Sequence, residues 1–421
     1  MTVLDQKFLR ENPEIVVKAI KDKNETVDFD LFLKLDSKRR ALIQKMEEAK
    51  QRRNRLSKEI ASKRKEGDDA ADLMVSTRKL SNEIKGLEKE LKTFEEEIRE
   101  VLVRIPNIPH SSVPVGEEAN SVVKEGGEKR EFDFTPLPHW ELGSALDILD
   151  FPSASKVAGS NFPSYKGAGA RLERALINFM LDFSTKRGYT EIFPPFLANR
   201  NSMFATGQLP KLEDDMYLIE EDDLFLNPTA EVPVTNIHRE QILRSDELPI
   251  KYAAYTACFR REAGSYGADT KGLLRVHQFN KVELVKFAAP ESSYEELDQM
   301  LDDVCAVLDA LEIPYRVSLL CTGELSFASA KTYDVEAWAP ALERYLEVSS
   351  VSNFEDFQAR RAEIRFRRAT GQKAEFVHTL NGSAVATPRT FAAIIENYQR
   401  KDGTVTVPQV LVPYVGVEQI G

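Results

Sequence analysis

The sequence contains few residues of the kinds that build metal cages or disulfide frameworks. Its 421 residues include only three cysteines, Cys258, Cys305 and Cys321, and five histidines. The cysteines lie far apart and form neither a CxxC pair nor a Cys/His ligand pattern. We therefore expect buried free thiols, no zinc site and no catalytic Cys/His pair.

Long apolar runs are also missing. No stretch reaches the roughly 18 uninterrupted apolar residues of a membrane-spanning helix, and the opening MTVLDQKFLREN lacks the apolar core of a signal peptide. Neither a Walker A sequence nor a GxGxxG after a predicted strand occurs, so the two common phosphate-binding loops are excluded. We expect a cytoplasmic protein without membrane association.

The charge of the chain is acidic as a whole but basic in one place. The net charge of −11 argues against a surface that binds nucleic acid throughout. Residues 34–66, however, carry 13 Lys/Arg against 5 Asp/Glu, whereas residues 67–105 carry 7 against 10. Positive charge is thus concentrated in one segment.

That segment belongs to a heptad pattern. From Leu35 to Ile60, and again from Leu73 to Ile105, apolar residues recur in alternating steps of four and three, with Arg39 and Arg53 set into the first series. The glycine-containing stretch EGDDAAD separates the two series. The pattern predicts an antiparallel coiled-coil hairpin over about 30–105, each helix about 45 to 50 Å long.

Two interpretations of the basic helix remain open on this evidence. Lys and Arg could simply form the solvated surface of a coiled coil, facing Glu across the hairpin. Alternatively, the helix could bind the phosphate backbone of an RNA, with Arg52, Arg53, Arg55 and Lys58 as the contacts.

The chain length and pattern predict two domains. We expect a helical arm at 1–110, ended by the prolines of RIPNIPH, and a larger domain at 111–421 that begins with a polar linker over 111–135. In the larger domain, apolar-periodic helices alternate with hairpin-like successions of strands. This predicts an α+β fold around an antiparallel sheet.

The stretch FRREAGSYGADTKGLLRVHQFNKVE, residues 259–283, carries the densest cluster of candidate functional residues. Residues 253–259 and 276–285 both have strand-like sequences, and the tip between them is rich in glycine. Arginines at the strand ends offer forked donors to phosphate oxygens, and the tip, AGSYGADTKG, is expected to be mobile. An ordinary hairpin with surface charges would have a similar sequence.

Two later segments fit the same chemistry. Glu347 and Ser350 provide oxygen ligands of the kind that Mg²⁺ accepts when phosphates complete its shell. Arg389 is expected in the first turn of an apolar helix, where a cation is poorly placed unless it meets an anion beside the helix N-terminus.

The order of these segments and the residues within them resemble those of a known family. The stretches are TGQLPK (206–211), NPTAEVPVTN (227–236), residues 259–283, KTYDVEAW (331–338), EVSSVSNFEDFQARR (347–361) and ENYQ (396–399). Together they resemble the three signature motifs of class II aminoacyl-tRNA synthetases, and in detail the bacterial type of the seryl-tRNA synthetase family. The resemblance covers the chain from end to end.

The resemblance implies a fold, an activity and partners. The fold would be the class II antiparallel sheet flanked by helices, and the enzyme a homodimer. It would join L-serine to tRNA(Ser), and to tRNA(Sec) where that tRNA exists, through a seryl-adenylate that consumes ATP and releases AMP and pyrophosphate. The basic arm would bind the tRNA.

The resemblance also implies residue roles. Arg260, Arg389 and Glu283 would act in catalysis, and Mg²⁺ would be held with the ATP phosphates by Glu347 and Ser350. ATP would be bound by Arg260, Arg261, Glu262, Arg275, Val276, Phe279, Glu347, Val348, Ser349, Ser350 and Arg389. Serine would be bound by Thr229, Ala230, Glu231, Arg260, Glu283 and Ser383.

Three features depart from the family pattern: the second cation Arg261, the sequence TPR before the last helix, and the ending VPYVGVEQIG. Two other functions were weighed. A tRNA-independent relative that loads a carrier protein would lack the long arm, and an inactive RNA-binding paralogue would lack charged residues such as Arg260 or Glu283. The sequence retains all of these features.

Overall fold

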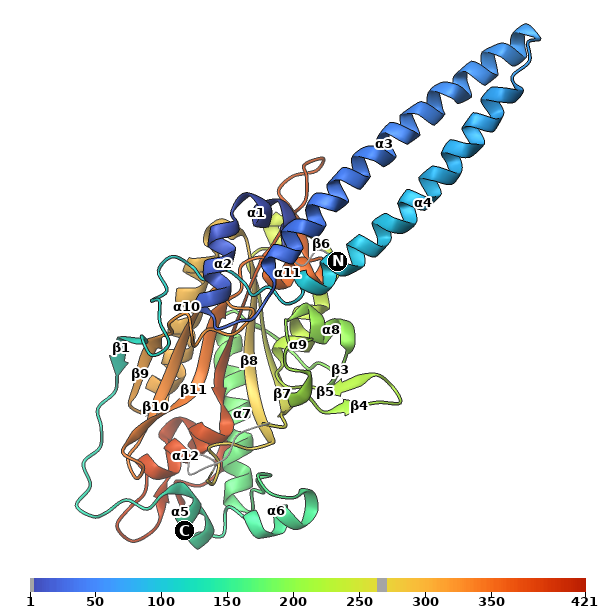
Figure 1. The fold of residues 1–421 in the computed structure, drawn as a ribbon. Coiled ribbons are helices and arrows are strands. Elements are labelled where there is room, and N and C mark those ends of the chain that lie inside the picture. Colours follow the sequence, from blue (N-terminus) through green and yellow to red (C-terminus); the bar gives the residue numbers. More distant parts are fainter. Residues whose placement is uncertain (1–3, 263–270) are drawn as a thin grey trace. The chain divides into compact units, whose positions relative to one another are not determined.

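The computed structural model describes residues 4–262 and 271–421 (Figure 1). The described residues divide into two compact units, one over residues 4–105 and the other over residues 106–262 and 271–421. Most of the glycine-rich tip that we expected to be mobile, residues 263–270, lies outside the described residues. Among the described residues, no helix is both long enough and apolar enough to cross a membrane.

The smaller unit consists of helices. Its helices are α1 (Gln6–Glu11), α2 (Pro13–Asp22), α3 (Phe29–Glu66) and α4 (Ala71–Leu102). The helices α3 and α4 run side by side as an antiparallel pair, and α3 ends at Gly67, whose φ of 79° is a backbone conformation that glycine adopts readily (Figure 1). The heptad residues Leu42, Ala49, Leu80 and Ile84 are buried between them. The predicted heptad series is therefore confirmed, whereas supercoiling of the pair stays a prediction.

One of the two arginines set into the heptad series has a clear structural partner. Arg39 lies 3.2 Å from Asp36, a carboxylate that is only 1% exposed. Arg10 of α1 and Arg40 contact the same carboxylate at 3.2 and 3.0 Å. A buried charge needs such pairing, and here the pairing fastens α1 to the base of α3.

The larger unit is built around an eight-stranded sheet. In the order of the sheet, its strands are β1 (Ser121–Gly126), β9 (Tyr315–Leu319), β10 (Lys331–Ala339), β11 (Arg344–Asn353), β14 (His378–Ala386), β8 (Gln278–Ala288), β7 (Ile250–Phe259) and β2 (Thr190–Ile192). Neighbouring strands pair antiparallel, except that β2 pairs parallel with β7. The α+β fold and its mainly antiparallel sheet are as predicted.

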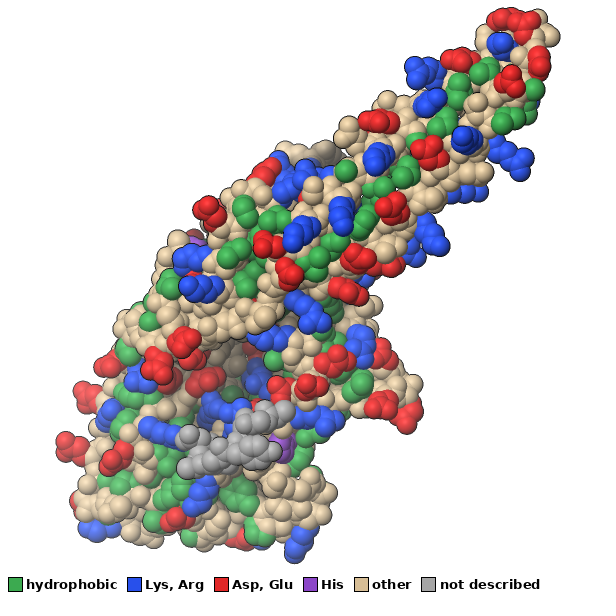
Figure 2. Space-filling view, viewed as in Figure 1, with side chains coloured by type: hydrophobic (Ala, Val, Ile, Leu, Met, Phe, Trp, Pro, Cys, Tyr) green, Lys and Arg blue, Asp and Glu red, His purple; other side chains and the backbone are tan. Residues whose placement is uncertain are grey.

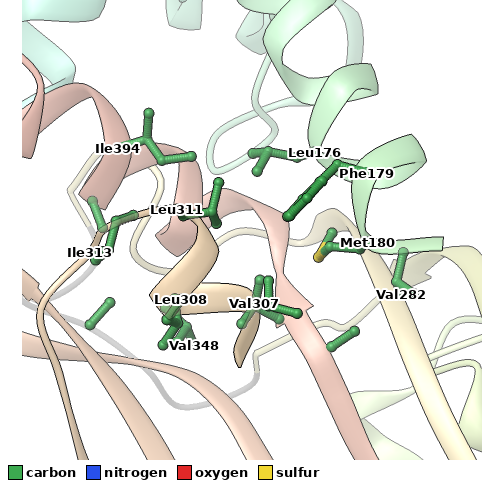
Figure 3. Packing of buried hydrophobic residues seen from close by; sticks show 14 of the residues in the cluster. Leu176, Phe179, Met180, Val282, Val307, Leu308, Leu311, Ile313, Val348 and Ile394 are labelled. Carbon is green, nitrogen blue, oxygen red and sulfur yellow. The ribbon is translucent and has the colours of Figure 1, made fainter. Parts of the chain in front are cut away.

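The main core lies where three long helices meet the sheet. These are α7 (Ala168–Lys186), α10 (Ser293–Ala310) and α12 (Thr387–Asn397). Figure 3 shows Leu176 and Met180 of α7 facing Val307 and Leu308 of α10, with Ile394 of α12 nearby. The apolar face of α7 thus packs against the core.

Short elements complete the unit. The remaining helices are α5 (His139–Ala145), α6 (Phe151–Ala158), α8 (Arg200–Ala205), α9 (Glu231–Thr235), α11 (Phe357–Ala362) and α13 (Val412–Val415). The remaining strands are β3 (Leu197–Asn199), β4 (Leu218–Ile219), β5 (Leu224–Leu226), β6 (Ile242–Arg244), β12 (Arg365–Arg367), β13 (Glu375–Phe376), β15 (Val405–Thr406) and β16 (Gln419–Ile420).

One prediction about this unit is wrong. We expected residues 111–135 to be a linker, but residues 121–126 form β1, which pairs with β9 at the edge of the main sheet. An edge strand tolerates polar side chains because only one of its sides pairs with the sheet and much of its surface faces water, so its sequence resembles a linker.

Candidate active site

Strand β8 separates a core face from a cavity face. Val282 and Leu284 point into the main core. The alternate residues Phe279, Lys281 and Glu283 line a cavity of about 560 Å³. This follows from the two-residue period of a strand, which sends neighbouring side chains to opposite faces.

Most of the predicted site residues line this one cavity. They are Thr229, Glu231, Arg260, Glu262, Arg275, Val276, Phe279, Glu283, Glu347, Val348, Ser349, Ser350, Ser383 and Arg389. They come from β8, β11 and β14, from the segments that flank β7 and β8, and from the starts of α9 and α12. Residues distant in sequence are therefore brought to one place by the order of the strands.

On the wall of the cavity, Arg260 and Phe279 lie together. The guanidinium carbon of Arg260 is 5.2 Å from the centre of the Phe279 ring, and its Nε donates to the Pro228 carbonyl at 3.3 Å. The planar ring and the planar cation offer adjacent stacking and charged surfaces.

Glu262 and Arg275 lie on the two sides of the glycine-rich stretch in the sequence and form an ion pair. Nε of Arg275 lies 2.7 Å from Oε2 of Glu262, and the Arg275 side chain is 44% exposed. Glu262 has a φ of 50°, the left-handed region that non-glycine residues seldom occupy. The ion pair accounts for both charges in the described structure.

Arg389 is held by main-chain oxygens. Its Nε donates to the Leu274 carbonyl at 3.0 Å and its Nη1 to the Glu347 carbonyl at 2.8 Å. The Glu347 carboxylate is 3.4 Å from the same nitrogen. As predicted, Arg389 lies in the first turn of the helix α12, and this turn forms part of the cavity wall.

Next to Arg389, three oxygen-bearing side chains form a small acidic group. The Ser350 hydroxyl donates to Oδ1 of Asp334 at 2.5 Å and lies 3.4 Å from Oε1 of Glu347. Burial, followed by the negative charge of Glu347, holds the pKa of the Asp334 carboxyl well above its usual range. A cation at this place would relieve that repulsion.

Glu283, which also lines the cavity, is almost fully enclosed. It is 2% exposed, and its Oε2 lies 2.6 Å from Nζ of Lys281, 3.2 Å from the Thr229 hydroxyl and 3.5 Å from the Ser383 hydroxyl. This buried carboxylate is therefore balanced by a lysine and by hydroxyl donors.

Glu231 lies close to this group. Burial, followed by the negative charge of Glu283, raises the pKa of the Glu231 carboxyl to about 7. Its Oε1 accepts a hydrogen bond from the Gln358 amide at 2.5 Å. An ammonium group placed between these carboxylates would favour their ionised forms.

Two predicted residues do not line the cavity. Nε of Arg261 donates to the Met216 carbonyl at 3.0 Å, and its guanidinium lies 4.9 Å from the Tyr217 ring centre. Ala230 is fully buried in a second apolar cluster. Adjacent residues on an extended segment point in opposite directions, which explains why Arg260 and Glu262 line the cavity and Arg261 does not.

Several polar residues that line or support the cavity were not predicted from the sequence, among them Lys281, Asn381 and Asp334. Lys281 could have been found, because it lies two residues before Glu283 on the same strand and therefore on the same face. Asn381 stands in the same relation to Ser383. Asp334 gave no local signal, since it meets Ser350 only through the pairing of β10 with β11.

The chain matches two family models. Residues 3–109 match the seryl-tRNA synthetase N-terminal domain, and residues 212–398 match the tRNA synthetase class II core domain (G, H, P, S and T). A serine–tRNA ligase from Desulfitobacterium hafniense is 56% identical over 421 residues, covering 100% of both chains. The chain belongs to the seryl-tRNA synthetase family.

Solved seryl-tRNA synthetases have the same fold. The enzyme from Pyrococcus horikoshii, in complex with ATP, superimposes with a TM-score of 0.94 at 38% identity and covers 99% of each chain. The cytoplasmic enzyme from Naegleria fowleri, in complex with AMP, gives 0.89 at 32% identity over 99% of this chain and 98% of its own. The class II fold expected from the sequence is thereby confirmed.

Proposed function

We propose that this chain is a serine–tRNA ligase that forms seryl-adenylate from L-serine and ATP and then transfers the seryl group to tRNA(Ser). The observation that carries the proposal is one cavity lined both by three arginines, Arg260, Arg275 and Arg389, and by two buried carboxylates, Glu231 and Glu283. Family membership supports it, as does the ATP bound to the relative from Pyrococcus horikoshii.

ATP would lie against the three arginines of the cavity. Phe279 would stack on the adenine, the backbone at Val276 would line the base, and Glu262 would contact its amino group. Arg260 would hold the α-phosphate, while Arg275 and Arg389 would meet the terminal phosphates. Val348 and Ser349 would complete the pocket, and Arg261 would add charge from outside it.

The residues at Asp334, Glu347 and Ser350 fit a magnesium ion that enters with the ATP phosphates. The donors are all oxygens, which Mg²⁺ prefers, and the crowding of negative charge favours a cation. Among the described residues no cluster of three or more His, Cys, Asp or Glu side chains could hold a metal alone. Glu347 and Ser350 would hold the ion together with phosphate oxygens. The positive charge of the ion would offset the negative charge of those oxygens.

Serine would lie beside the two buried carboxylates, Glu231 and Glu283. Thr229 and Glu231 would receive its ammonium group, Glu283 would accept a hydrogen bond from its hydroxyl, and Ser383 would close the pocket. If alanine bound instead, the buried Glu283 would lose a partner, which is costly in an enclosed site. Threonine would be excluded by the volume of its extra methyl group.

The first chemical step needs no general base, because the serine carboxylate is already ionised. Its oxygen attacks the α-phosphorus of ATP, the bond to the leaving pyrophosphate breaks, and seryl-adenylate forms. Arg260 and Arg389 would offset the negative charge that builds on the phosphate oxygens. A ribose hydroxyl at the end of the tRNA then attacks the acyl carbon and AMP leaves.

The helical arm would bind tRNA. Arg52, Arg55 and Lys58 are exposed and Arg53 is half-buried on α3, and Figure 2 shows Lys and Arg side chains distributed along the two long helices. Phosphate contacts of this kind position an RNA without reading its sequence. tRNA(Sec) would be accepted where it is present, and both substrates support a cytoplasmic location.

The enzyme would act as a homodimer through the outer edge of the main sheet. Among the strands that the structure describes, the edge strand β2 pairs only with β7, and the adjoining Phe193 is 76% exposed. An open strand edge with an exposed aromatic residue is favourable to association with a second copy.

The decisive test is ATP/pyrophosphate exchange with each of the twenty amino acids. We expect serine alone to support exchange, and tRNA(Ser) to be charged by the same preparation. Exchange with a different amino acid would refute the proposal. Serine-dependent exchange without any tRNA charging would instead identify a carrier-loading enzyme.

A further inference from the structure

A fully buried histidine connects the backbone near Arg275 to the helix α12. His139 and Glu396 are both 0% exposed. Nδ1 of His139 lies 2.8 Å from Oε1 of Glu396, and the backbone N–H of His139 donates to the same oxygen at 2.9 Å. On the other side of the ring, the backbone N–H of Leu273 donates to Nε2 at 3.0 Å.

These partners fix the protonation of the ring. A backbone N–H can only donate, so Nε2 of His139 is the accepting nitrogen. The ring is therefore neutral, with its proton on Nδ1, where it faces the Glu396 carboxylate. His139 accepts from one segment and donates to another, which no apolar side chain can do.

The approach of the backbone to His139 depends on a glycine. Gly272 has a φ of +68°, and a Cβ atom there would lie 2.4 Å from Nε2 of His139 and 3.1 Å from Cε3 of Trp140. The preceding Lys271 places its ammonium 4.5 Å from the centre of the Trp140 ring. Residues 271–273 are therefore held closely against the start of α5.

The same segment lines the cavity from Leu273 onward. The Leu274 carbonyl accepts from Arg389, and Arg275 follows. Arg389 and Glu396 lie seven residues apart on α12, about two turns, and so share a face. Helix α12 thus holds residues 272–275 twice, directly through Arg389 and indirectly through Glu396 and His139.

We propose that His139 is a positioning residue for ATP: it fixes the backbone of residues 272–275 and thereby places Arg275 at the cavity. The proposal rests on the ATP-binding roles proposed above for Arg275 and Arg389. His139 does not itself line the cavity, so its influence passes through the residues that it contacts, of which Leu273 belongs to this segment.

Two substitutions separate the nitrogens of the ring. In His139→Asn the shorter amide ends near the position of Nδ1, so a donor toward Glu396 remains and the acceptor for Leu273 is lost. In His139→Gln the longer amide reaches the position of Nε2, so an acceptor for Leu273 remains. Both variants keep a buried polar side chain of similar kind.

The measurement is ATP/pyrophosphate exchange at varied ATP and varied serine, with active sites counted by single-turnover pyrophosphate release. For His139→Asn we expect the KM for ATP to rise about tenfold, the effect of losing roughly one hydrogen bond, while the KM for serine stays within about twofold. For His139→Gln we expect the KM for ATP to stay within about threefold. An unchanged KM for ATP in His139→Asn, or equal rises for both substrates, overturns the proposal.

A second pair of variants decides the question if His139→Asn does not fold. Gly272→Ala would force the backbone away from His139, whereas Gly371→Ala imposes a similar strain at a φ of +85° with nothing within 4 Å. We expect only Gly272→Ala to raise the KM for ATP, and equal effects overturn the proposal. A wild-type protein without serine-dependent exchange would refute the proposed function itself, which these comparisons distinguish.

Discussion

Glu283 is the residue on which amino-acid selection depends in the proposed function. It is 2% exposed and surrounded by Lys281 and two hydroxyl groups. A hydrogen bond to such a charged, enclosed group contributes about 1.5 to 3 kcal/mol, which corresponds to roughly 10- to 100-fold in binding.

We therefore expect Glu283→Gln to lower kcat/KM for serine at least tenfold and to narrow the preference for serine over alanine. Exchange assays with both amino acids measure this. Glu296→Gln is the matched control, because Glu296 is also a buried carboxylate paired with a lysine, Lys286, but does not line the cavity. Loss of activity with an unchanged serine-to-alanine ratio would contradict the assignment.

Glu173 is a buried residue of α7 whose carboxylate contacts β8 and the start of α12. Its Oε1 accepts from the Asn280 amide at 2.8 Å and from the Thr387 hydroxyl, and its Oε2 has no hydrogen-bond partner among the described residues. Burial raises the pKa of this carboxyl to about 7. The folded protein thus keeps a proton here that the unfolded chain releases above about pH 4.5.

The sign of the resulting pH dependence follows directly. The stabilising contribution of Glu173 is fully present below about pH 4.5 and is lost as the pH rises to about 7, a change on the order of 3 kcal/mol. Glu173→Gln cannot ionise, so its melting temperature should fall less than that of the wild type between pH 5 and pH 8. The exposed Glu191→Gln is the control and should behave as the wild type. A Glu173→Gln variant with the wild-type pH dependence would show that this carboxyl does not titrate as argued.

At the scale of elements, the helix α3 carries the charge that the tRNA-binding proposal needs. Neutralising one cluster on α3 should raise the KM for tRNA at least tenfold and leave ATP/pyrophosphate exchange unchanged, because the cavity lies in the other unit. The control removes the same number of charges from exposed positions of α4. The two variants are the glutamine substitutions of Arg52, Arg53, Arg55 and Lys58, and those of Lys79, Lys85, Lys89 and Lys92.

Deletion of residues 35–104 extends this test from charge to the whole arm. We expect tRNA charging to be abolished and serine-dependent exchange to remain near normal. If both activities fell together, a dedicated role of the arm in tRNA binding would be refuted.

How much of each element the sequence predicts depends on how local its signal is. The heptads of α3 and α4 were predicted, since side chains three and four residues apart define a helical face by themselves. Strand β1 was not, because an edge strand has no apolar alternation. Arg260, Glu283 and Arg389 were found through motifs, whereas Asp334 and His139 matter through partners far away in sequence, which local patterns do not reveal.

At the scale of the whole molecule, the open edge at β2 predicts association. We expect sedimentation at twice the monomer mass of 47.6 kDa at micromolar concentration. Phe193→Ser should shift the population toward monomer, because Phe193 is 76% exposed beside β2. Val157→Ser, which alters a residue of α6 that is 87% exposed, should not. A wild-type protein that sediments as a monomer would rule out the dimer.

Because the apolar contact between α3 and α4 repeats along the hairpin, the length of the hairpin can be changed without changing the residues of the cavity. Because the buried positions recur every seven residues, one repeat can be removed from each helix without disturbing the contacts of the rest. Each such paired removal shortens the hairpin by about 10 Å. A series of variants with progressively shortened arms would therefore measure how tRNA charging depends on the length of the arm.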